Sequence, residues 1–171
     1  MTIDLQDATR PGPELSDVAR QVQWLRDRQE VVDALYRFAA GQDLGDPELF
    51  LSAFSPDAVL DFTQPASRFG AGVPVMRGRE TIAGILTTLE PLATTHTVTN
   101  PRVVLDGDRA DLWALVEAQH VLRAEPHRHL LLKNTYDVDL VRRDDLWVIT
   151  AMAIRTVWSD GDGMVLFGGR A

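Results

Sequence analysis

The chain has 171 residues, 45% of them hydrophobic, and a formal net charge of −8 at pH 7. This length suits one domain with a sizeable core, and the negative charge disfavours nucleic acid and anionic membranes as partners, because both would repel the chain. No cysteine is present, which excludes disulfides, thiol nucleophiles and thiolate metal sites. Since the acidic N-terminus does not resemble a signal peptide and no apolar run is long enough to cross a bilayer, we expect a cytoplasmic protein without a membrane partner.

The first predicted element is a long amphipathic helix that begins at Leu15, after a flexible tail at residues 1–14. Its apolar residues recur at steps of three, four and seven and form one stripe: Val18, Val22, Leu25, Val32, Leu35 and Ala39. Gly41, Gly45 and Pro47 are expected to end the helix, so that Asp43 lies where it unwinds. A short helix from Pro47 to Phe54 should follow.

The rest of the chain is predicted to be mostly strand. A strand at 58–63, a loop at 64–77 that would border a pocket and a helix at 79–89 precede four extended stretches at 93–105, 109–124, 128–142 and 146–158. Residues 159–171 are interpreted as a C-terminal tail, which leaves a single domain at 15–158. This order predicts an α+β fold, a cone-shaped barrel in which helices pack on a strongly curved, mostly antiparallel sheet and enclose a pocket.

Three polar residues interrupt the inward faces of the predicted strands. Every even position from Ala110 to Leu122 is apolar except His120, which should therefore face the interior. Asn134 and Tyr136 interrupt the apolar face of the next strand in the same way. Because a buried polar group costs free energy unless it is hydrogen-bonded, a sheet that served stability alone would carry valine there.

His96 lies in the segment TTHTVTN (94–100), among residues typical of a strand. Taken alone, His96 is more often a packing histidine, and Asp43 more often an ordinary turn aspartate. As a pair they would do chemistry, because a carboxylate that holds one ring nitrogen fixes the tautomer and makes the other nitrogen a better base. The spacing of the two residues in the sequence does not by itself place them together.

Several segments, taken in order, resemble the SnoaL-like family of the nuclear transport factor 2-like superfamily. They are LRDRQEVVDALYRFAAGQDLGD, FSPDAVLDF, TTHTVTN, DGDRADLWALVEAQH and YDVDLVRRDDLWVI, and the similarity spans roughly residues 18–158. The pattern is most similar to that of scytalone dehydratase-like lyases, whose aspartate and histidine match Asp43 and His96. The resemblance also implies substrate-binding roles for His120, Asn134, Tyr136, Arg155, Phe62 and Gln42. The last two stand where scytalone dehydratase has tyrosines that hold a water, so its carbonyl-activation scheme is not expected here.

The resemblance implies a cofactor-free, metal-free lyase or isomerase of dehydratase type. His96 would be the general base and acid, Asp43 would orient it, and the substrate would be a small, mostly apolar hydroxylated or carbonyl compound. One alternative is a polyketide or terpenoid cyclase of SnoaL type. Another is a non-catalytic ligand-binding or accessory subunit similar to the small subunit of ring-hydroxylating dioxygenases, whose cavity side chains would fill. A homo-oligomer, dimer or trimer, is expected to form through an exposed sheet face bearing Trp113 or Trp147.

Overall fold

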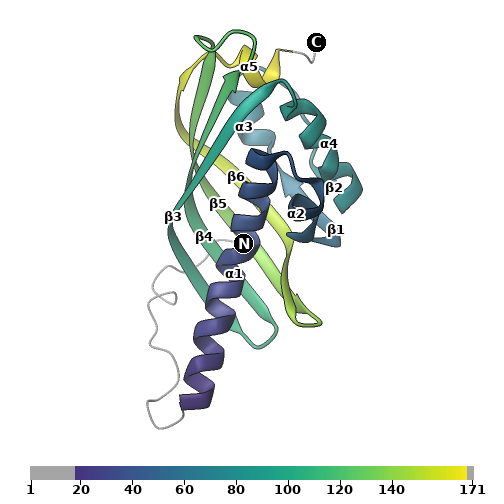
Figure 1. Cartoon of the computed structure of the whole chain (residues 1–171), viewed down its shortest axis with the longest axis vertical. Helices are drawn as coiled ribbons and strands as arrows, with labels where there is room; N and C mark the ends of the chain where they lie inside the picture. The colour runs from purple at the N-terminus through teal and green to yellow at the C-terminus, as the bar shows by residue number, and fades with distance from the viewer. Residues whose placement is uncertain (1–17, 169–171) are drawn as a thin grey trace.

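A computed structural model describes residues 18–168, in which a curved sheet wraps around several helices (Figure 1). The predicted tail at 1–14 and the expected helix start at Leu15 lie outside the described residues. In chain order the elements are α1 (Val18–Leu44), α2 (Pro47–Ser52), β1 (Phe54–Asp61), α3 (Thr63–Arg68), β2 (Met76–Arg77), α4 (Arg79–Leu89), β3 (Leu92–Asp106), β4 (Arg109–Leu122), β5 (His129–Arg143), β6 (Leu146–Gly161) and α5 (Met164–Phe167).

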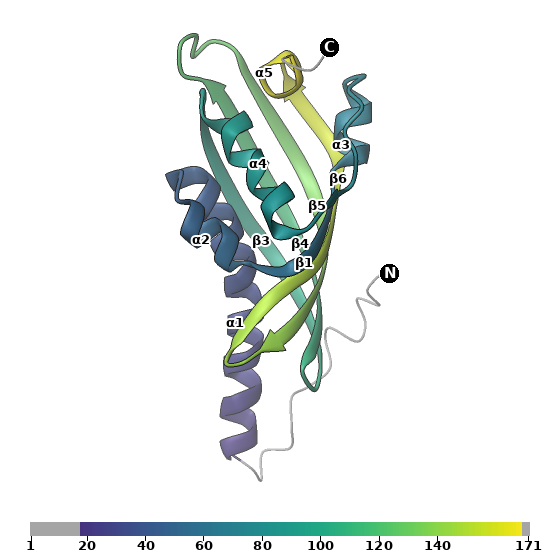
Figure 2. The same cartoon turned by 90° about the vertical axis from the view of Figure 1, so that its right-hand side faces the viewer.

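The six strands form one sheet in the order β2-β1-β6-β5-β4-β3. All neighbours are antiparallel except β1 and β6, which run parallel. The pairing register shifts within β3 and twice within the β5–β6 pair, and such irregularities bend strands. The sheet therefore curves around α1 and α4 without closing into a barrel (Figure 2). The predicted α+β fold with a long N-terminal helix on a curved sheet is confirmed.

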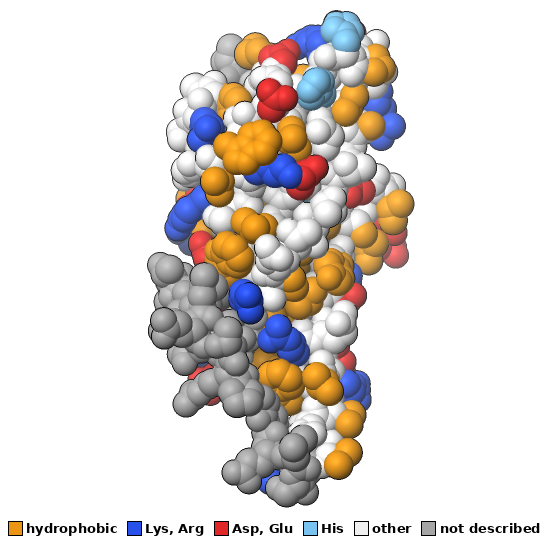
Figure 3. Space-filling model, turned by 90° about the vertical axis from the view of Figure 1, so that its left-hand side faces the viewer, with side chains coloured by type: hydrophobic (Ala, Val, Ile, Leu, Met, Phe, Trp, Pro, Cys, Tyr) orange, Lys and Arg blue, Asp and Glu red, His pale blue; other side chains and the backbone are white. Residues whose placement is uncertain are grey.

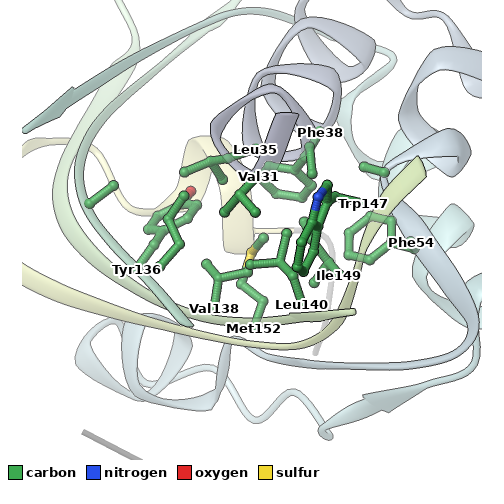
Figure 4. Close-up of a cluster of buried hydrophobic side chains, with 14 of the residues drawn as sticks. Val31, Leu35, Phe38, Phe54, Tyr136, Val138, Leu140, Trp147, Ile149 and Met152 are labelled. Atoms are coloured by element: carbon green, nitrogen blue, oxygen red, sulfur yellow. The ribbon is translucent and has the colours of Figure 1, made fainter. Parts of the chain in front are cut away.

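The core lies between α1 and the concave side of the sheet. The residues of β4 and β5 alternate between buried and half-buried along almost their whole length, as the even-position pattern predicted. From α1, Val31, Leu35 and Phe38 face the buried side chains of the sheet (Figure 4). Tyr136 lies at one edge of this cluster, so its ring belongs both to the core and to the space beside it.

The predicted apolar stripe of α1 is buried in one half of the helix only. Val32, Leu35 and Ala39 are buried, as expected, whereas Val18, Val22 and Leu25 are 69%, 52% and 57% exposed. The reason is that the first turns of α1 project beyond the sheet (Figure 1). None of the helices in the described part of the chain is both long and apolar enough to span a membrane.

Gly41 lies inside α1, which continues to Leu44, and so the expectation that it ends the helix is wrong. A Cβ atom at Gly41 would lie 2.5 Å from backbone atoms of Phe50 in α2. The glycine therefore lets two helices approach closely. The helix ends before Gly45, whose φ of +63° suits glycine. Asp46 then caps α2 by accepting a hydrogen bond of 3.0 Å from the backbone N–H of Leu49.

The predicted loop at 64–77 contains α3 and β2, and β1 begins four residues before its predicted start. The predicted C-terminal tail at 159–171 is also wrong over its first part, because β6 continues to Gly161 and α5 follows. Gly161 has a φ of +101°, and a Cβ there would lie 2.2 Å from the carbonyl oxygen of His129. Only glycine fits this turn, which returns the chain to the sheet so that Phe167 is buried.

Trp147 is fully buried and not on an exposed sheet face, which corrects the expectation for this residue. It lies in the core cluster, and three consecutive residues, 147–149, are buried close to the register shift at the start of β6. Trp113 is half-buried, while Val157 and Trp158 are exposed. On the face drawn in Figure 3, apolar side chains are dispersed among charged and neutral ones.

Candidate active site

A cavity of about 280 Å³ opens between the concave side of the sheet and the helices α4 and α5. Most of its lining is apolar, and the polar groups come from α1, α4 and three neighbouring strands. The lining residues are Phe38, Gln42, Leu60, Phe62, Val73, Pro74, Met76, Thr81, Gly84, Ile85, Thr88, Leu89, His96, Ala118, His120, Leu132, Asn134, Tyr136, Ile154, Leu166 and Phe167. A mainly apolar cavity with a few convergent polar groups is typical of a small-molecule site.

Asp43 and His96 are in direct contact at one wall of this cavity. The Nδ1 atom of His96 lies 2.6 Å from Oδ1 of Asp43, and the backbone N–H of His96 donates to Oδ2 at 2.7 Å. The hydroxyl of Thr94 donates to Oδ1 at 2.9 Å. Since α1 ends beside β3, its last turn places the carboxylate against two residues of the strand that face the same side.

These contacts determine where the protons of Asp43 and His96 lie. Burial raises the pKa of Asp43, but the hydrogen bonds from His96 and Thr94 outweigh it and hold the pKa below its usual value. An ionised carboxylate only accepts hydrogen bonds, so the His96 ring must carry its proton on Nδ1. The second nitrogen, Nε2, is then the basic one, and His96 lines the cavity with a side chain that is only 3% exposed.

His120 lies beside His96, with ring centroids 5.9 Å apart and ring planes at 88°. Its Nδ1 atom is buried and has no hydrogen-bond partner among the described residues. Burial, together with the neighbouring His96, lowers the pKa of His120 to about 4, so the ring is neutral near pH 7. A neutral buried imidazole at the cavity wall is available to bind a polar group of a ligand.

Asn134 and Tyr136 form the second polar wall. The Oδ1 atom of Asn134 accepts a hydrogen bond of 2.8 Å from the hydroxyl of Thr156, which leaves the amide N–H groups as donors. Burial raises the pKa of Tyr136 while a hydrogen bond with Asn134 opposes this, so the phenol keeps its proton. The backbone N–H of Thr156 is in turn held by Gln64 of α3 at 2.8 Å.

The other predicted site residues divide into two groups. Gln42 and Phe62 line the cavity, and the amide of Gln42 donates to the carbonyl oxygen of Phe38 at 3.2 Å. Arg155 does not line it, which corrects the prediction of a substrate-binding role. Its side chain is 56% exposed and lies 3.9 Å from Asp137, because odd-numbered residues in this part of β6 point away from the concave side.

Several cavity residues were not predicted from the sequence. Thr94 shares the strand face of His96 two positions away, so the alternation of a strand was the signal that would have found it. Leu166 and Phe167 line the cavity from α5, and Phe167 stacks on Phe62 and Phe69 with centroids 6.0 and 5.3 Å apart. The apolar residues before the final glycines were the only sequence signal for this helix.

The described residues contain no group of three or more histidine, aspartate and glutamate side chains arranged to hold a metal ion. The cavity wall presents an imidazole held by a carboxylate, a neutral histidine and two neutral side chains that can donate hydrogen bonds. Such a set can take a proton from carbon, stabilise charge on an adjacent oxygen and return the proton to a leaving group.

Comparison with known proteins places the chain among related sequences and folds. The sequence profile of the SnoaL-like domain matches residues 23–153. The chain is 32% identical over 149 residues to terrestric acid biosynthesis cluster protein E of Penicillium crustosum, a match that covers 82% of this chain and 90% of the relative.

Solved structures show the same fold. A protein from Novosphingobium aromaticivorans DSM 12444, provisionally described as a scytalone dehydratase, matches with a TM-score of 0.72 at 16% identity, covering 83% of this chain and 91% of the other. The hexachlorocyclohexane dehydrochlorinase LinA-type3 from Novosphingobium barchaimii LL02 matches with a TM-score of 0.68 at 18% identity, covering 86% and 97%. At these identities the likeness concerns the fold.

Proposed function

The chain belongs to the SnoaL-like domain family, within the nuclear transport factor 2-like fold, and from that premise we propose that it is a cofactor-free lyase or isomerase of dehydratase type. The observation that carries the proposal is the 2.6 Å contact between Asp43 and His96 at the wall of a largely apolar cavity. The substrate is a small, mostly apolar compound with a carbonyl or hydroxyl group.

In the proposed reaction, Nε2 of His96 takes a proton from the carbon next to a carbonyl group, and Asp43 stabilises the imidazolium that forms. The electron pair moves onto the carbonyl oxygen, which accepts hydrogen bonds from Tyr136 or Asn134. As the enolate collapses, the bond to a β-hydroxyl breaks and His96 returns its proton, so that water leaves. The steps need only proton transfers, and the two polar walls of the cavity supply the groups for them.

The two alternative functions are a cyclase and a non-catalytic accessory subunit. A SnoaL-type cyclase would use the same proton abstraction before ring closure, so the substrate alone separates it from a dehydratase. The relative from a biosynthesis cluster is consistent with either reaction. An accessory subunit was expected to have a cavity filled by side chains, and the open volume of about 280 Å³ argues against it.

We further propose a homo-oligomer, for which the exposed Val157 and Trp158 and the half-buried Trp113 offer apolar contact area.

The test uses a panel of uncharged β-hydroxy ketones in D₂O, with water loss and deuterium incorporation at the α-carbon followed by NMR. The wild-type chain should catalyse both, and His96→Ala should lose at least about 100-fold in rate, the usual contribution of a positioned base. Thr95→Ala is the matched control, because Thr95 is the exposed neighbour on the opposite strand face. Full turnover by His96→Ala would refute the proposal.

A further inference from the structure

We infer that the cavity selects an uncharged substrate, with its oxygen-bearing end at Asn134 and Tyr136 and its apolar end against α5, and that it rejects carboxylates, phosphates and amines. This inference rests on the function proposed above and narrows its substrate class. The resemblance implied a small, mostly apolar hydroxylated or carbonyl substrate, and Arg155 was expected to bind an anionic or carbonyl group of it.

Charged side chains are absent from the described lining of the cavity. Of the described residues that line the cavity, none is Arg, Lys, Asp or Glu. His120 is neutral near pH 7 because burial lowers its pKa to about 4. An anion that entered would lose its hydration without meeting a cation, and such burial is strongly unfavourable.

The fixed charges around the cavity also disfavour a charged ligand. Asp43 lies directly behind His96, so an anion beside His96 would also be repelled by this carboxylate. Arg155, the cation for which a substrate-binding role was expected, is 56% exposed on the other side of β6. A cationic ligand is also disfavoured, because no carboxylate lines the cavity among the described residues. Asp43, the nearby carboxylate, already accepts hydrogen bonds from Thr94 and His96.

Polar groups are distributed unevenly around the cavity. Asn134 presents its amide donors and Tyr136 its neutral phenol, on adjacent inward positions of β5. Phe62, Leu166 and Phe167 form an apolar wall where α5 meets the residues after β1. A carbonyl or hydroxyl oxygen is satisfied at the first wall and an apolar ring or chain at the second, which orients the ligand.

Matched naphthalene probes test this selection by equilibrium binding to the whole chain at pH 7.5, with calorimetry as the readout. The neutral probes are 2-acetylnaphthalene and 2-naphthamide, and the charged ones, of similar shape, are 2-naphthoate and 2-naphthylmethylammonium. We expect the neutral probes to bind at least about 100-fold more tightly than either charged one, the ratio that a few kcal/mol of uncompensated burial produces.

A substitution on α4 should weaken this selection without touching the polar walls. Gly84 lines the cavity from α4, and a Cβ atom there would meet nothing within 4 Å. Gly84→Lys should therefore fit and tighten 2-naphthoate about tenfold, whereas the uncharged Gly84→Gln should not. Both substitutions replace a glycine within a helix, so neither should destabilise it.

Equal affinity of the wild-type chain for 2-naphthoate and 2-acetylnaphthalene would overturn the inference, and so would failure of both neutral probes to bind below millimolar concentration. Loss of the preference in Gly84→Gln as well as in Gly84→Lys would also contradict it. Because these measurements need no turnover, they separate the two proposals. An active His96→Ala variant would refute the acid–base function and leave the binding preference standing.

Discussion

Asp27 and Asp43 are the two least exposed carboxylates of helix α1, and the structure gives them different surroundings. Asp27 meets Arg142 at 2.7 Å and accepts a hydrogen bond of 2.9 Å from Gln23. The Arg142 guanidinium also stacks on Trp147, 4.8 Å from the ring centroid. Asp43 meets His96 and Thr94 beside an open cavity.

The difference lies in the partner of each carboxylate. The hydrogen bond from Arg142 is the main reason that the pKa of Asp27 is lowered, and a guanidinium does not release its proton near neutral pH. Neither Asp27 nor Arg142 lines the cavity, and we expect this pair to act on stability alone. The partner of Asp43 is an imidazole whose second nitrogen is free of this contact, and such a nitrogen can take up a proton from a ligand. In the proposed function, one helix thus bears a carboxylate that supports the fold and another that orients the catalytic base.

The largest expected effect follows from replacing each carboxylate by its amide. Asp43→Asn should lower kcat by about 10³–10⁴-fold, because the amide no longer selects the Nδ1–H tautomer of His96. Asp27→Asn should leave kcat unchanged and lower the free energy of unfolding. Steady-state kinetics and urea denaturation of both variants test this contrast, and an equal loss of kcat in the two would remove the distinction between them.

Arg142→Met tests the pair of Asp27 and Arg142 by removing its cation. This change leaves Asp27 largely buried without its counter-ion and should cost about 2–3 kcal/mol of unfolding free energy, less than a fully buried pair because Arg142 is 22% exposed. Arg143→Gln is the matched control, since the pair of Arg143 with Asp57 is exposed and should contribute much less to the free energy of unfolding. Equal losses in the two variants would show that burial of the Asp27 pair does not matter.

Acid should lower the free energy of unfolding, because His120 at the cavity is held neutral in the folded chain. The pKa of His120 is lowered to about 4, below its ordinary value of 6.5, so the unfolded chain binds this proton more readily than the folded one. The unfolding free energy should therefore fall as the pH drops from about 6.5 towards 4, by about 2 kcal/mol between pH 7.5 and 5. Urea titrations at both pH values should show this loss in the wild type and a smaller one in His120→Leu. His127→Leu, at an exposed position, should retain the wild-type loss.

The smallest expected effect concerns Arg155, which the structure removes from the site. Arg155→Gln should change kcat/KM by less than about twofold, because the side chain is exposed and faces Asp137 on the outer side of the sheet. Kinetics with the same substrate as for Asp43→Asn provide the measurement. A loss above tenfold would return Arg155 to the set of functional residues.

Periodicity in the sequence was sufficient to predict which strand residues face inward. His120, Asn134 and Tyr136 are buried as the alternation in β4 and β5 required, because side chains of a strand alternate whatever the strand packs against. The same reasoning failed for Val18, Val22 and Leu25 of α1. A helical period identifies an apolar face, but whether another element covers that face depends on where the sheet ends.

The sequence by itself therefore determined the α+β class, the inward faces of the long strands and the resemblance that singled out Asp43 and His96. Only the tertiary structure decided that these two touch, that Arg155 faces outward and that α5 returns to place Phe167 at the cavity. The physical reason is that periodicity is local, being fixed by the backbone of each element. Contacts between residues 53 positions apart in the chain depend instead on sheet curvature, on helix ends and on single glycines such as Gly161, whose effect appears only when the chain is packed.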